Sequence, residues 1–305
     1  MHNYILLFLG VICAAAGGEF FVRGSVGIAQ AARISPAIIG ATVAAFATSS
    51  PEFAVGIVAA AAQEPGIALG NALGANVLNV ALILGIALAI SPIRAPRSSV
   101  HRDFPIALAV PVATGLLCLD GTLSRTDGVI MLGLFIMWFI AVLREARRQR
   151  KTSQTGETVS GWRAAAYAAL GVVLLLGAGE LIVTGARGIA SSFGISEFVI
   201  GATIVAAGTT VPELMMVIIA KWRGHAELGL GTILGSNIFN GLWIVPVTAI
   251  IYPIDIEWFE VAGTLIFGVV TMIAAFPPRR GVIGRPRGML LLLLYLFYIG
   301  AIFVL

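Results

Sequence analysis

Two carboxylates stand in the middle of long apolar stretches, and each follows a proline and a group of hydroxyl residues. The first copy reads Gly40-Ala-Thr-Val-Ala-Ala-Phe-Ala-Thr48-Ser49-Ser50-Pro51-Glu52, and the second reads Gly201-Ala-Thr-Ile-Val-Ala-Ala-Gly-Thr209-Thr210-Val211-Pro212-Glu213. A charge within an apolar membrane segment is costly, so such residues usually handle ions or protons. Proline breaks a helix, which predicts breaks at Ala47-Thr48 and Gly208-Thr209 with carbonyl oxygens free to face a ligand.

The oxygen atoms around these carboxylates define the kind of ligand. The set comprises the carboxylates of Glu52 and Glu213, the hydroxyls of Thr48, Ser49, Thr209, Thr210 and Ser236, and the amide oxygens of Asn79 and Asn240. Without His or Cys, this set suits a hard cation such as Ca²⁺ or Na⁺ and argues against zinc or copper. Two negative charges are balanced by one Ca²⁺ or by two or more Na⁺, so the ions would exclude each other.

The chemistry is repeated because the chain is duplicated. A constant shift of 161 residues (213 − 52) also lays Gly70-Asn-Ala-Leu-Gly-Ala-Asn76-Val-Leu-Asn79 on Gly231-Thr-Ile-Leu-Gly-Ser-Asn237-Ile-Phe-Asn240. Such a register indicates an internal repeat. Asn76 and Asn237 fit either a site or a contact between helices. The glycines at four-residue spacing favour close helix packing.

The composition predicts an all-α membrane protein that positions these residues on long helices. Hydrophobic residues make up 59% of the chain and charged residues 11%, which excludes a large soluble domain. The basic residues lie in short loops, as at an inner membrane face, and this argues against a nucleic-acid partner. Cys13 and Cys118 lie in apolar segments and are expected to be buried thiols. Ten spans are predicted, at residues 4–27, 36–62, 66–90, 104–120, 127–146, 163–187, 197–220, 227–251, 258–276 and 288–305.

Five spans per half require the two copies to cross the membrane in opposite senses, as inverted repeats do. We expect a first five-helix repeat at residues 1–146, a cytoplasmic linker at 147–161 and a second repeat at 162–305. Nearly all Arg and Lys residues then fall on one side, whereas Arg125 and Arg187 fall on the other. By the positive-inside rule the basic side is cytoplasmic, and both termini lie outside a plasma or inner membrane.

At these residues the chain resembles the sodium/calcium exchangers of the cation/calcium antiporter superfamily, over nearly its whole length. The resemblance implies a core of spans two, three, seven and eight, past which the first and sixth spans slide. It implies Glu52 and Glu213 as central metal ligands, joined by the side-chain oxygens named above and by the carbonyls of Ala45 and Ala206. The long regulatory loop of animal members is missing.

Two departures from the family pattern concern the sodium subsites. Ala75 stands where the second repeat has Ser236, so we expect one subsite to lack an oxygen. Asn240 replaces an Asp of some relatives, which argues against potassium coupling.

We therefore predict a secondary antiporter, not an enzyme, that exchanges Na⁺ for Ca²⁺ by alternating access and extrudes Ca²⁺. It needs no cofactor, because Ca²⁺ and Na⁺ bind as transported ions, and it works as a monomer in the lipid bilayer. A proton-coupled antiporter of Ca²⁺ or another divalent cation is an alternative, because carboxylates in a low dielectric can take up protons. A passive cation channel is a weaker alternative, because its pore is usually built from several subunits.

Overall fold

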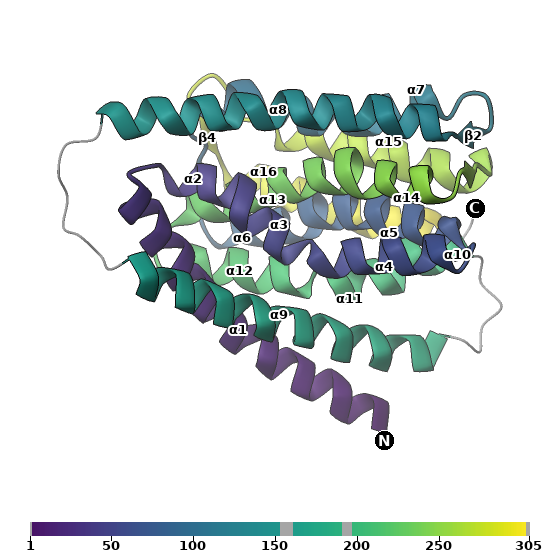
Figure 1. The fold of residues 1–305 in the computed structure, drawn as a ribbon, viewed down its shortest axis with the longest axis horizontal. Coiled ribbons are helices and arrows are strands. Elements are labelled where there is room, and N and C mark those ends of the chain that lie inside the picture. Colours follow the sequence, from purple (N-terminus) through teal and green to yellow (C-terminus); the bar gives the residue numbers. More distant parts are fainter. Residues whose placement is uncertain (1, 153–160, 191–196, 303–305) are drawn as a thin grey trace.

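The structure is a computed structural model that describes residues 2–152, 161–190 and 197–302 of the 305-residue chain (Figure 1). The elements of the first half are α1 (His2–Ala32), α2 (Pro36–Ile39), η1 (Gly40–Ala44), α3 (Ala45–Thr48), α4 (Ser50–Ala61), α5 (Pro65–Leu78), η2 (Asn79–Leu84), α6 (Gly85–Ile90), β1 (Ile93–Arg94), η3 (Ser99–Asp103), α7 (Phe104–Leu117), β2 (Thr122–Leu123) and α8 (Arg125–Thr152), where η marks a π-helical segment. Those of the second half are α9 (Gly161–Ala190), α10 (Glu197–Ile200), η4 (Gly201–Val205), α11 (Ala206–Thr209), α12 (Val211–Trp222), α13 (Ala226–Phe239), η5 (Asn240–Ile244), α14 (Val245–Ile251), β3 (Ile254–Asp255), α15 (Trp258–Ala275), β4 (Val282–Ile283) and α16 (Arg285–Ile302).

The helices are arranged as a buried centre with outer helices around it. In an apolar 18-residue window, 78% of the residues of Pro65–Ile90 and 83% of those of Ala226–Ile251 are buried, against only 28% for Arg125–Gln149 and 22% for Arg285–Ile302. The outer helices expose large apolar side chains, among them Val129, Ile266 and Phe297. Five of the described helices are long and apolar enough to cross a membrane, or seven when two bent pairs are each counted as one span. The prediction of an all-α membrane protein is confirmed at this level.

The predicted helix breaks are confirmed, each shifted by one residue. Helix α3 ends at Thr48 and α4 starts at Ser50, with a bend of 43°, and α11 ends at Thr209 before α12 starts at Val211, with a bend of 47°. The prolines lie in the first turn of α4 and α12, where a missing main-chain donor costs nothing. Each break therefore places a carboxylate in the first turn of a new helix.

Helices α1 and α9 form an outer layer along one edge of the molecule (Figure 1). They touch at glycines: a side chain at Gly24 would collide with the main chain of Ala164 and Ala168, and one at Gly171 with Phe21. The close approach needs glycine because its lack of a Cβ lets two backbones meet. This pair also contacts α12, so it lies directly beside the helices that carry the carboxylates.

The segment between the halves differs from the prediction. Helix α8 continues to Thr152, so residues 147–152 of the predicted linker are helical. Arg, Lys and Gln have high helix propensity, and this lets the helix run on past the apolar stretch. Residues 153–160 lie outside the described part of the chain. In Figure 1 the end of α8 and the start of α9 lie at the end of the molecule opposite to the start of α1 and the end of α16.

Four short strands join loops that the sequence analysis did not connect. Strand β1 pairs antiparallel with β4, and β2 pairs antiparallel with β3. Each strand has only two residues. Each pair ties a loop of the first half to a loop of the second, so the two halves are held together at both ends of the bundle.

The glycines predicted to permit close packing do so. A Cβ at Gly70 or Gly74 would collide with the main chain of Phe198 or Ala202, and one at Gly231 or Gly235 with the main chain of Ala37 or Ala41. We therefore expect Gly74→Ala to destabilise the protein by about 1–3 kcal/mol, the usual cost of overpacking. Thermal unfolding in detergent checks this. The control is Gly133→Ala, where the added methyl group meets nothing within 4 Å and should change little. Equal melting temperatures for the two variants would contradict the prediction.

Candidate cation-binding site

Two helices cross the middle of the molecule and bring the repeated motifs together. Helix α5 packs against η4 and α11, and α13 packs against η1 and α3. Both carboxylates, Glu52 and Glu213, are fully buried there. The other side chains predicted for the site are buried as well: Thr48, Ser49, Asn79, Thr209, Thr210, Ser236 and Asn240. Their role as cation ligands remains a prediction, and the contacts below describe how they are held.

The carboxylate of Glu213 is held by hydroxyls from both halves of the chain. Ser49 Oγ donates to Glu213 Oε1 at 3.2 Å, and Ser236 Oγ donates to the same oxygen at 3.3 Å. Glu213 Oε2 is buried and has no hydrogen-bond partner. One carboxylate oxygen is thus fixed in place, and the other is free to bind a ligand.

The carboxylate of Glu52 has no such support. Neither of its oxygens accepts a hydrogen bond, although both are buried. The repeat explains the difference: Ala75, which has no hydroxyl, occupies the position of Ser236, and Thr210, the counterpart of Ser49, donates instead to the carbonyl of Ala206 at 2.8 Å. The repeat is therefore asymmetric at the carboxylates.

The two negative charges lie together without a compensating cation from the protein. The two motifs meet here, because Ser49, three residues before Glu52, donates to the carboxylate of Glu213. Among the described residues, no Lys or Arg forms an ion pair with either one. No group of three or more His, Cys, Asp or Glu residues occurs in this part of the chain either, so the charge of the site comes from these two carboxylates. Two unpaired charges in a buried position are strongly unfavourable unless a cation or a proton compensates them.

Four asparagines form a symmetric network between α5, η2, α13 and η5. Asn76 Nδ2 donates to the carbonyl of Asn237 at 3.2 Å, and Asn237 Nδ2 donates to the carbonyl of Asn76 at 3.1 Å. The Oδ1 atom of Asn237 accepts from Asn79 Nδ2, and that of Asn76 accepts from Asn240 Nδ2, both at 3.1 Å. Because Asn79 and Asn240 use their nitrogens here, their Oδ1 atoms are left buried without a partner. Asn76 and Asn237 are thus contacts between helices that orient two candidate ligands.

The threonines of the motifs also commit their hydrogens elsewhere. Thr48 Oγ1 donates to the carbonyl of Ala44 at 3.1 Å, and Thr209 Oγ1 donates to Asn71 Oδ1 at 3.1 Å. A hydroxyl that donates its hydrogen to the protein keeps its lone pairs for a cation. The carbonyls of Ala45 and Ala206 are not left free by the prolines, because they accept the main-chain N–H groups of Ser49 and Thr210. By position, the carbonyls that lose a donor are those of Ala47 and Gly208.

Asn71 is a residue that the sequence analysis missed. It is fully buried on α5, accepts the Thr209 hydroxyl, and leaves its own Nδ2 without a partner. Its counterpart in the repeat is Thr232, whose hydroxyl donates to the carbonyl of Leu228 in its own helix. A polar residue in both copies of an apolar run was the signal available in the sequence.

We expect Asn71→Leu to weaken cation binding. Without Asn71 the Thr209 hydroxyl keeps only the longer bond to the Ala206 carbonyl, at 3.3 Å, and is held less firmly. Losing one neutral hydrogen bond should raise the half-saturating Ca²⁺ concentration about 2- to 10-fold. Ca²⁺ uptake into proteoliposomes measures this. Thr232→Val removes a buried hydroxyl at the equivalent position, which bonds to the Leu228 carbonyl and to Met216 Sδ but to no predicted ligand, and should leave the half-saturating concentration unchanged. The same increase in both variants would contradict a specific role for Asn71.

Comparison with known proteins places the chain. The family model described as "Sodium/calcium exchanger protein" matches residues 2–144 and 163–304. The chain belongs to the sodium/calcium exchanger family. It is therefore a transmembrane ion transporter of an antiporter family rather than an enzyme.

Individual relatives match most of the chain. The inner membrane protein YrbG of Escherichia coli is 33% identical over 262 residues, which covers 83% of this chain and 81% of YrbG. The sodium/calcium exchanger MaX1 of Methanosarcina acetivorans is 27% identical over 344 residues, covering 99% and 98%. A structure of the sodium-calcium exchanger NCX_Mj soaked with Na⁺ and Sr²⁺ has a TM-score of 0.82 and 32% identity, covering 99% of both chains.

Proposed function

We propose that this member of the sodium/calcium exchanger family exchanges Na⁺ for Ca²⁺ at the Glu52 and Glu213 site and extrudes Ca²⁺. The observation that carries the proposal is the buried pair of carboxylates without a protein cation. Five oxygens of the predicted ligands are buried without hydrogen-bond partners: Glu52 Oε1 and Oε2, Glu213 Oε2, Asn79 Oδ1 and Asn240 Oδ1. Ca²⁺ binds about 6–8 oxygens, which these atoms and the hydroxyl lone pairs of the motifs can supply.

The charge of the pair also gives a reason for exchange rather than one-way transport. An empty site would leave two unpaired charges in a low-dielectric environment, so the conformational change is unfavourable until cations have bound. One Ca²⁺ or several Na⁺ satisfy that condition equally, and they compete for the same oxygens. Each conformational change that carries ions in one direction must therefore be followed by a return with ions bound.

The topology proposed with this function is ten spans in two inverted halves, with one site per chain and a monomer as the working unit. The asparagine network supports the inversion, because residues 161 positions apart make reciprocal bonds. We propose that both termini face outward and that the basic end is cytoplasmic. The α1 and α9 pair, which packs against α12 from the outer layer, would slide past the core to open the site alternately to the two sides.

Ion uptake into liposomes tests the proposal. Purified protein is reconstituted with Na⁺ inside, and uptake of radioactive Ca²⁺ is followed. We expect uptake that requires internal Na⁺ and stops when the Na⁺ gradient is removed. A parallel set with K⁺ inside and a proton gradient separates the alternative: uptake driven by protons alone would replace Na⁺ as the coupling ion. Single-channel currents without counterflow would overturn antiport altogether.

A further inference from the structure

A strongly basic cavity lies near the C-terminal end of α8, where the loops that contain β1 and β4 meet. It has a volume of about 770 Å³, and its basic lining residues are Arg94, Arg97, His101, Arg279 and Arg280. Among the residues that the structure describes, no Asp or Glu contributes to its walls. The loops are fixed to each other, because β1 pairs with β4 and the Ala95 N–H donates to the Gly281 carbonyl at 2.8 Å. Four arginines are thus gathered around one space whose described lining holds no acidic residue.

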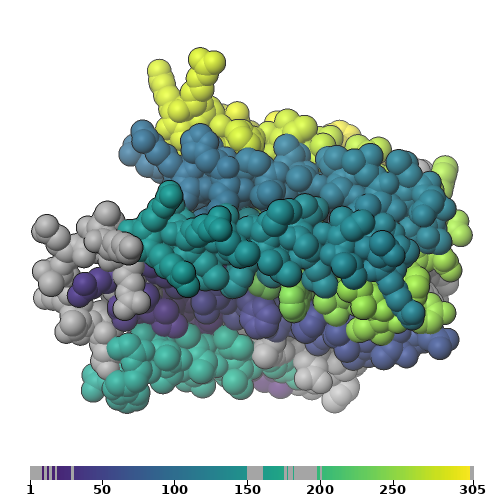
Figure 2. All heavy atoms as spheres, turned by 45° about the horizontal axis from the view of Figure 1, so that its top comes forward, coloured from purple at the N-terminus to yellow at the C-terminus, as the bar shows by residue number. Residues whose placement is uncertain are grey.

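An apolar groove continues from this cavity along the side of the molecule. It has a volume of about 340 Å³ and lies between α7 and α8. Ile106, Ala109 and Ala113 line it from α7, and Leu134, Met137 and Ala141 line it from α8. His101 and Pro105 line both the groove and the basic cavity, so the two spaces adjoin. Figure 2 shows the blue segment that contains α7 running between the teal α8 and the yellow C-terminal segments.

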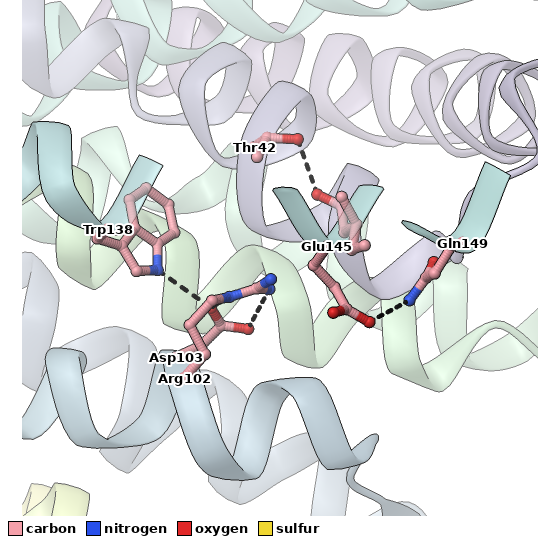
Figure 3. Close-up of polar contacts among 7 residues, drawn as sticks. Thr42, Arg102, Asp103, Trp138, Glu145 and Gln149 are labelled. Carbon is pink, nitrogen blue, oxygen red and sulfur yellow. Dashed lines mark hydrogen bonds and ion pairs between the residues drawn. The ribbon is translucent and has the colours of Figure 1, made fainter. Parts of the chain in front are cut away.

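A fixed guanidinium marks the end of the groove. Asp103 is fully buried and accepts hydrogen bonds from Arg102 Nε at 2.7 Å, Arg102 Nη2 at 3.0 Å and Trp138 Nε1 at 3.1 Å (Figure 3). This leaves Arg102 Nη1 buried with no partner, although Arg102 lines the groove. Asp103 offsets the charge of Arg102, so Arg102 offers a hydrogen-bond donor, while the net positive charge comes from the arginines of the cavity.

We propose that the cavity and the groove together bind an anionic glycerophospholipid. The phosphate headgroup would occupy the basic cavity, and one acyl chain would lie in the groove along α7 and α8. Both parts are needed to select this ligand. A soluble phosphate has no apolar part that could bind in the groove, and a zwitterionic lipid gains little net electrostatic attraction from four arginines. Basic pockets between membrane helices on the cytoplasmic side recognise anionic headgroups in this way. The inference does not depend on which ion the protein transports.

Native mass spectrometry of the full-length protein, titrated with phosphatidylglycerol or phosphatidylcholine, tests the proposal. We expect phosphatidylglycerol to bind at least about 10-fold more tightly than phosphatidylcholine, and Arg97→Gln with Arg280→Gln to remove most of that preference. The matched control is the double variant Arg144→Gln with Arg147→Gln. It removes the same charge near the C-terminal end of α8, at two residues that do not line the cavity. The control should keep the preference.

The groove is tested separately on α7. Ala109→Phe fills the groove and should weaken phosphatidylglycerol binding, whereas Val112→Phe, on an exposed position that does not line the groove, should not. If Ala109→Phe does not fold, the arginine variants decide, because those side chains are exposed. Three results would each overturn the proposal. The first is equal affinity for the two lipids, and the second is an equal effect of both pairs of arginine substitutions. The third is competition by inorganic phosphate together with unchanged phosphatidylglycerol binding in Ala109→Phe.

Discussion

Replacing Glu213 with Gln is expected to lower Na⁺-dependent Ca²⁺ uptake by about 100-fold or more. The change keeps the size of the side chain and leaves an oxygen to accept from Ser49 and Ser236, but it removes one of two charges that bind the cation. A charged ligand contributes about 1.5–3 kcal/mol to each interaction it makes, and about 2.7 kcal/mol corresponds to a 100-fold change. Glu52→Gln should have an effect of similar size. Tracer uptake into proteoliposomes measures both.

The same variants make a second prediction that separates lost binding from lost folding. In buffer without Na⁺ or Ca²⁺, both Gln variants should melt at a higher temperature than the wild-type protein, because a buried uncompensated charge has been removed. Added Ca²⁺ should raise the melting temperature of the wild-type protein and not that of the variants, since a ligand stabilises only the protein that binds it. Glu64→Gln, at an exposed position before α5, serves as the control and should behave like wild type. Normal uptake by Glu213→Gln would remove the proposed site.

Much of the architecture could be predicted because membrane segments and repeats leave strong signals. The apolar stretches located the helices to within a few residues, as at residues 36–62, where the structure has α2 to α4 ending at Ala61. Prolines after hydroxyl residues located both helix breaks. The exception was α8, where the polar residues after 146 ended the predicted span although their helix propensity carries the helix to Thr152.

The contacts between side chains were less predictable. The sequence identified the position of Ala75 as a missing hydroxyl, but not that Thr210 would bond to its own helix and leave Glu52 without a donor. Asn71 escaped notice because its partner Thr209 lies 138 residues away, a contact that depends on how α5 packs against the second half. The π-helical segments that start at Asn79 and Asn240 carry no simple sequence signal, although each begins at a predicted ligand.

The asparagine network leads to the second large expected effect, that of Asn237→Ala. The change leaves the buried Asn79 Nδ2 without its acceptor, and it also removes one of the donors to the Asn76 carbonyl. Leaving a buried polar group unsatisfied costs about 1–3 kcal/mol, so we expect a clearly lower melting temperature. Without its acceptor the Asn79 amide is free to rotate, and the half-saturating Ca²⁺ concentration should rise about 10-fold or more. Thr271→Val is the control, because its buried hydroxyl bonds only within α15 and lies on a helix that carries no predicted ligand.

A double-mutant cycle shows whether Asn237 acts through Asn79. Asn79→Ala alone removes the candidate ligand oxygen and should weaken Ca²⁺ binding to a similar extent, with less loss of stability, because Asn237 keeps its bond to the Asn76 carbonyl. If Asn237 only orients Asn79, the double variant should bind Ca²⁺ no more weakly than Asn79→Ala. Residues that share a hydrogen-bond network are non-additive in this way. Fully additive losses of Ca²⁺ affinity would mean that Asn237 itself contacts the cation. An unchanged Ca²⁺ affinity in Asn237→Ala would mean that the network contributes only to the packing of α5 against α13.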